Sequence, residues 1–151
     1  MLLALALALV AGSPPWLRPP AGWTIVESPP RFGALQILAM WREPAPADGF
    51  AQNLSLGVER FPGSLDAYVG ATTRAIRTAA RGPVAVRVAP FGCSSGPARL
   101  LQYDTAAFGA RAHFEQLLIK RTSDVYVATY TRGVDQRPEN EAGSALRAVC
   151  R

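Results

Sequence analysis

The residues best suited to chemistry are Arg111, His113 and Glu115, which lie in a segment of alternating polar and apolar residues. If that segment is a β-strand, side chains two apart share a face. A polar site there would use His113, the sole histidine, as a base, with Glu115 as its partner and Arg111 as an anchor for an anion. The alternative is a solvated strand face on which charges pair across strands. We favour the alternative, because spacing places no nucleophile or second acid nearby.

Residues 92–96, Gly-Cys-Ser-Ser-Gly, formally match the Gly-x-Ser-x-Gly pattern of a nucleophile elbow. An elbow requires a helix directly after the serine, whereas Pro97 and an expected strand follow here. The sequence contains no glycine-rich phosphate loop and no carboxylate cluster with calcium spacing. We therefore expect no catalytic residue in this loop, no cofactor and no metal site.

The first twelve residues carry no charged or polar side chain. Their length is typical of the apolar region of a secretory signal and too short for a membrane-spanning helix. The alternative, a buried N-terminal helix, is disfavoured by the prolines that follow within residues 13–21. We expect an exported protein, periplasmic or extracellular, with a signal segment at 1–12, a proline-rich linker at 13–21 and a single domain at 22–151.

Cys93 and Cys150 are the only cysteines. In an oxidising compartment a single pair indicates one disulfide. A metal site would need more ligands than these two and His113, and the sequence has no Cys-x-x-Cys motif. The sequence therefore predicts a structural disulfide between Cys93 and Cys150.

The composition is that of a basic globular domain, 49% apolar and 18% charged, with a formal net charge of +5. A basic exported protein could meet anionic lipid headgroups, acidic wall polymers or an acidic protein. The basic residues are not interleaved with aromatic ones as in nucleic-acid-binding surfaces, so we expect no nucleic acid partner. We expect a monomer.

Three arginines, Arg74, Arg77 and Arg81, share one face of an expected helix. They could dock an acidic partner or a membrane surface. A solvated helix face is the alternative, and we favour it.

Hydrophobic periodicity predicts strands, a helix, four strands and a second helix. Ser64 is a good N-cap for the first helix, which Gly82-Pro83 ends. The expected strands cover residues 23–26, 33–43, 53–61, 84–90, 98–105, 111–121 and 124–132, and the second helix covers 138–150. This order predicts an α+β fold, an antiparallel sheet of six to seven strands with two helices packed on it.

Four segments resemble the PsbP-like superfamily: residues 49–56, 62–69, 96–103 and 124–131. The first two carry a Phe-x-x-Asn strand followed by a Ser-Leu-x-x-Tyr helix. The resemblance implies an α/β/α sandwich without family-wide catalytic residues, in proteins that mostly act as accessory or binding components outside the cytoplasm.

Two functions follow as hypotheses. The first is an exported, non-enzymatic accessory or binding domain that acts on a protein or a cell-envelope component. The second is a small ligand-binding protein or hydrolase that uses the strand face of Arg111, His113 and Glu115.

Overall fold

The computed structural model describes residues 17–46 and 49–151. The expected signal segment at residues 1–12 lies outside this part of the chain. Within the described part, no helix is both long and apolar enough to cross a membrane.

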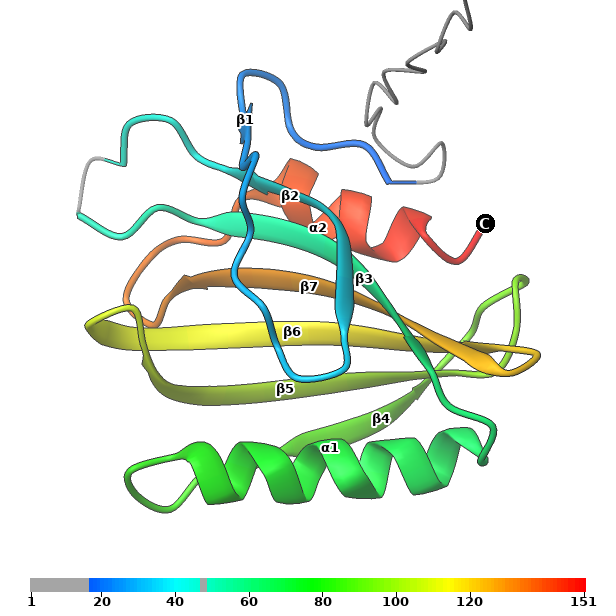
Figure 1. Cartoon of the computed structure of the whole chain (residues 1–151). Coiled ribbons are helices and arrows are strands. Elements are labelled where there is room, and N and C mark those ends of the chain that lie inside the picture. Colours follow the sequence, from blue (N-terminus) through cyan, green and yellow to red (C-terminus); the bar gives the residue numbers. More distant parts are fainter. Residues whose placement is uncertain (1–16, 47–48) are drawn as a thin grey trace, which may run out of the picture.

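Seven strands form one antiparallel sheet in the order β1-β2-β3-β7-β6-β5-β4 (Figure 1). The strands are β1 (Thr24–Ile25), β2 (Gln36–Arg42), β3 (Asn53–Arg60), β4 (Arg87–Phe91), β5 (Ala98–Ala107), β6 (Ala110–Arg121) and β7 (Asp124–Gly133). The predicted α+β fold with an antiparallel sheet is confirmed.

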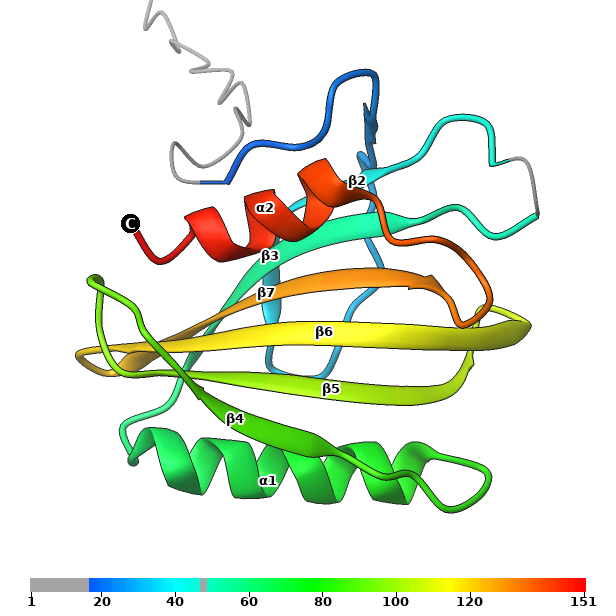
Figure 2. The ribbon, with the colours of Figure 1, turned by 180° about the vertical axis from the view of Figure 1, so that it is seen from behind.

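Two helices, α1 (Leu65–Ala79) and α2 (Asn140–Ala148), cover opposite faces of the sheet (Figures 1 and 2). The side-chain oxygen of Ser64 accepts a 3.1 Å hydrogen bond from the backbone N–H of Ala67, which caps α1 as the sequence indicated. The helices therefore make the outer layers of an α/β/α arrangement.

Each face of the sheet has its own hydrophobic core. Leu117 is buried on the α2 face and its neighbour Leu118 on the α1 face, because successive side chains of a strand point to opposite sides. On the α1 face, Leu65 and Tyr68 of the helix pack with Leu118. The central strands are thus buried on both faces, which fixes their register.

Leu17 is fully buried in the core on the α2 face, although it falls in the segment expected to be a linker. Four residues later, the backbone N–H of Ala21 donates to Glu141 Oε2 of α2 at 3.3 Å. The described part of residues 13–21 therefore lies against the domain.

The predicted disulfide between Cys93 and Cys150 is present, with 4.6 Å between the Cα atoms. It joins the loop after β4 to the residues after α2. The hydroxyl of Ser94 donates to the carbonyl of Cys150 at 2.7 Å, so hydrogen bonds reinforce the same junction. The serines of this loop therefore hold the end of the chain after α2 against the loop after β4.

Strand β4 begins at Arg87 and not at Val84, where alternation predicted its start. Its pairing with β5 starts at Arg87 opposite Gln102. The preceding residues 83–86 form no strand, and three of them, Pro83, Ala85 and Val86, line a cleft.

Candidate functional site

Strand register brings Asp104, His113 and Arg132 into one row across the sheet. Asp104 of β5 pairs with His113 of β6, which pairs in turn with Arg132 of β7. Side chains of directly paired residues lie on the same face. The row therefore combines a carboxylate, the sole histidine and a guanidinium from three separate strands.

The imidazole of His113 lies between two carboxylates. Its Nδ1 is 2.6 Å from Asp104 Oδ1, and its Nε2 is 3.8 Å from Glu115 Oε1. The His113 side chain is 19% exposed and that of Glu115 is 13% exposed, so both are largely shielded from solvent. These contacts fix the orientation of the ring and place a carboxylate beside each ring nitrogen.

Arg132 is held in place by backbone carbonyls. Its Nη1 donates to the carbonyls of Gly133 at 3.2 Å, Val134 at 3.3 Å and Gln136 at 3.0 Å. These bonds tie the guanidinium to the loop between β7 and α2. A charged group anchored in this way loses little side-chain entropy when a ligand binds.

A cleft of about 790 Å³ opens around this row. Its lining comes from residues 83–87, β5, β6 and β7: Pro83, Ala85, Val86, Arg87, Gln102, Tyr103, Asp104, Arg111, His113, Glu115 and Arg132. Three guanidinium groups thus face two carboxylates and an imidazole. Among the residues that the structure describes, the lining contains no serine, threonine, cysteine or lysine.

The expected strand face of Arg111, His113 and Glu115 exists, and all three side chains line the cleft. Sequence reasoning missed Arg87, Asp104 and Arg132. Asp104 is the second acid that spacing along one strand did not place, and its Oδ1 lies 2.6 Å from His113 Nδ1.

Arg74, Arg77 and Arg81 are all exposed, and none of them lines the cleft. Residues 67–103 contain five arginines and no acidic residue, so the basic character of α1 continues into β4 and β5. The fifth arginine, Arg99, pairs with Asp66 at 3.0 Å. α1 ends at Ala79, so Arg74 and Arg77 lie on the helix, whereas Arg81, expected on the same helix face, lies in the loop after it.

Asp104, His113 and Glu115 do not converge as metal ligands. Among residues 17–46 and 49–151, no group of three or more histidine, cysteine, aspartate or glutamate side chains could hold a metal ion. The arrangement instead places hydrogen-bond donors and positive charge in the wall of the cleft.

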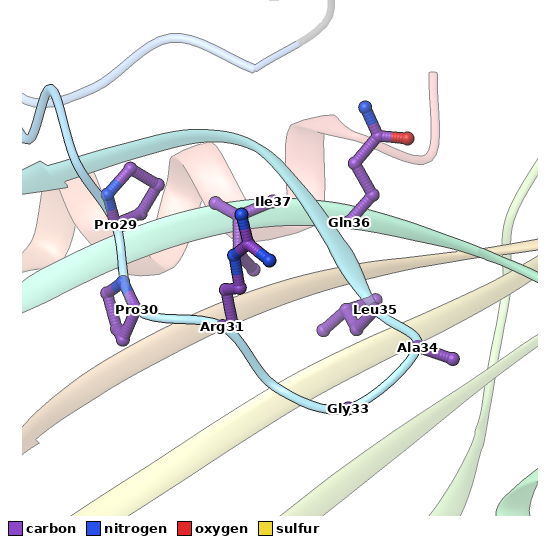
Figure 3. A pocket seen from close by; sticks show the side chains of 8 residues that line it. All are labelled: Pro29, Pro30, Arg31, Gly33, Ala34, Leu35, Gln36 and Ile37. Atoms are coloured by element: carbon purple, nitrogen blue, oxygen red, sulfur yellow. The ribbon is translucent and has the colours of Figure 1, made fainter.

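A second hollow of about 400 Å³ lies along residues 29–37, where the chain turns into β2 (Figure 3). In the described part of the chain, Arg31 is the only charged residue that lines it. It therefore offers fewer groups for recognition than the cleft.

No protein-family model matches the sequence, and no curated protein matches it. Among solved structures, PA94 from Pseudomonas aeruginosa, a protein of unknown function, is 18% identical with a TM-score of 0.63, and the match covers 83% of this chain and 94% of PA94. LpqN, involved in cell envelope biogenesis of Mycobacterium tuberculosis, is 12% identical with a TM-score of 0.49, and the match covers 87% of this chain and 83% of LpqN. The similarity to PA94 shows that the two chains share a fold.

Proposed function

We propose that the protein is an exported binding domain of the PsbP-like type, and that its cleft binds an acidic group of a protein or cell-envelope component. The observation that carries the proposal is the convergence of Arg87, Arg111 and Arg132 with His113 in one open cleft. Arginine suits carboxylate and phosphate groups because its planar guanidinium can donate two parallel hydrogen bonds.

The fixed geometry of the cleft supports binding. Arg132 is anchored by three carbonyls and His113 by Asp104, so neither has to be ordered when a ligand arrives. Arg87 and Arg111 are exposed and can approach the ligand from the rim. Two preorganised groups and two exposed arginines suit an anion.

Export is part of the proposal and has two supports. The apolar segment at residues 1–12 is typical of a secretory signal. The disulfide between Cys93 and Cys150 suits an oxidising compartment.

Hydrolysis by the same cleft is less well supported. A general base needs an accessible nitrogen within hydrogen-bond reach of the proton it takes. Both ring nitrogens of His113 face carboxylates. Tyr103, whose hydroxyl is the only one among the described lining residues, is buried, which raises its pKa. These features favour a role for His113 in holding a ligand.

The proposal is tested by NMR titration of the ¹⁵N-labelled protein with inorganic phosphate and, separately, with glucuronate. Saturable shifts confined to the backbone amides around Arg111, His113 and Arg132 are expected for at least one anion. Shifts that grow linearly without saturation, or that appear only on α1, would exclude the cleft as an anion site.

A further inference from the structure

Phe108 occupies a turn position that bulky residues normally avoid. It has a φ of +52°, and the following Gly109 has a φ of +78°. They form the two-residue loop between Ala107 and Ala110, the last pair of β5 and β6. Two successive positive φ values are typical of a type I′ turn, in which asparagine, aspartate or glycine is preferred. A phenylalanine held in this strained conformation points to a role for the ring itself.

The ring of Phe108 extends into solvent. At 63% exposure, Phe108 is the most exposed large hydrophobic residue in the described part of the chain. Its ring centroid lies 6.4 Å from that of Phe50, which belongs to the loop between β2 and β3. A hollow of about 270 Å³ adjoins the pair, with Val26 and Met40 in its lining. The β5–β6 turn and the β2–β3 loop thus place Phe108 and Phe50 side by side, and this pair is called the aromatic tip below.

Arginines flank this aromatic tip. Arg42 lines the hollow and Arg111 follows Phe108 by three residues, and both are exposed. Two carboxylates near these arginines are engaged: Asp104 contacts His113, and Glu43 Oε2 accepts a hydrogen bond from the backbone N–H of Gln52 at 3.3 Å. Both exposed arginines can therefore meet an anion beside the tip.

The loop between α1 and β4 lies at the same end of the molecule as the β5–β6 hairpin and the β2–β3 loop (Figures 1 and 2). This loop contains the exposed Arg81. An aromatic tip with arginines at the same end of the molecule suits an anionic membrane, because the ring can enter the interface while the cations meet headgroups.

We propose that this end of the molecule docks on an anionic lipid surface, with Phe108 inserted into the interface beside Phe50. Arg42, Arg81 and Arg111 contact the lipid phosphates. The charge of +5 on the whole chain adds a long-range attraction to the same surface. This docking goes beyond the proposed function, since it needs no ligand in the cleft.

Vesicle co-sedimentation at low ionic strength tests the proposal, with phosphatidylcholine vesicles that contain or lack about one third phosphatidylglycerol. The protein is expected to sediment with the anionic vesicles only. Phe108→Asn is expected to lower the partition coefficient about tenfold, because the ring no longer leaves water. The same substitution is expected to raise the melting temperature, because asparagine suits the turn.

Phe32→Ala is the matched control, since Phe32 is also an exposed aromatic, at 48%, but precedes β2. It is expected to leave vesicle binding unchanged. Lack of binding of the unmodified protein to anionic vesicles would overturn the proposal. Equal binding by Phe108→Asn and the unmodified protein would also overturn it, and the melting temperature shows that the variant is folded.

Discussion

Asp104 Oδ1 lies 2.6 Å from His113 Nδ1 across the paired strands β5 and β6. Glu115 approaches the other ring nitrogen, with 3.8 Å between Oε1 and Nε2. One imidazole is therefore held by a carboxylate of its own strand and by another of the neighbouring strand. The two carboxylates therefore set the orientation of the His113 ring in the cleft.

Replacement of Asp104 by alanine is expected to reduce the free energy of unfolding by about 0.5–1.5 kcal/mol, the usual contribution of one hydrogen bond. Asp104 is 45% exposed, so the lower half of that range applies. Urea denaturation followed by circular dichroism measures the change. Asp135→Ala, at another exposed carboxylate, is the control and should be neutral. Equal stability of the two variants would mean that the contact contributes nothing to the fold.

Loss of the disulfide is expected to lower the melting temperature. The bond links residues 57 apart, and in the chain-entropy model a loop of that length stabilises the folded state by up to about 4 kcal/mol. Cys93→Ser/Cys150→Ser and the reduced unmodified protein should show the same loss. A melting temperature that does not change on reduction would contradict this account.

Stability is expected to fall at alkaline pH because of buried tyrosines, among them Tyr68 and Tyr103. Burial raises the pKa of Tyr103, and burial together with the hydrogen bond to Glu59 raises the pKa of Tyr68. The folded state therefore keeps the phenol proton above pH 10, where the unfolded state loses it. Each tyrosine's contribution to the free energy of unfolding is fully present below about pH 10. Above that pH, each tyrosine lowers the free energy of unfolding by up to about 1.4 kcal/mol per pH unit.

Urea denaturation at several pH values between 8 and 11 measures this dependence. Tyr68→Phe/Tyr103→Phe is expected to show a shallower decline above pH 10 than the unmodified protein. Identical slopes would show that other groups cause the alkaline loss.

Leu17→Ala is expected to destabilise the domain by about 2–5 kcal/mol, as truncation of a buried leucine usually does. Leu17 is fully buried, whereas the adjacent Arg18 is exposed. Arg18→Ala should therefore leave the melting temperature unchanged. If Leu17→Ala also left the melting temperature unchanged, residues 17–21 would behave as the linker that the prolines in this segment predicted.

Much of the fold follows from periodicity. Alternation over β3, β6 and β7 and the capped helix after Ser64 gave the element order and the α+β class. The predicted start of β4 at Val84 was wrong, because residues 84–86 alternate like a strand but do not pair with β5. Local alternation cannot indicate where an edge strand loses its partner.

The cleft was predictable in part. Alternation placed Arg111, His113 and Glu115 together. The two-residue loops at 108–109 and 122–123 also fix which residues lie opposite His113, namely Asp104 and Arg132. The lengths of these two turns are therefore enough to place both residues beside His113. Arg87 could not be found in this way, because its register with Gln102 depends on the long loop around Cys93.

The central claim is that the arginines of the cleft bind an acidic group. The most direct test compares the Kd for phosphate or glucuronate, whichever saturates, between Arg87→Glu/Arg111→Glu and Arg74→Glu/Arg77→Glu. Both variants change the net charge equally, and only the first alters the cleft. The account predicts that the first pair weakens binding at least about tenfold, or 1.4 kcal/mol, while the second changes it by less than about twofold. Equal weakening by the two pairs would contradict the account, since binding would then depend on the overall charge.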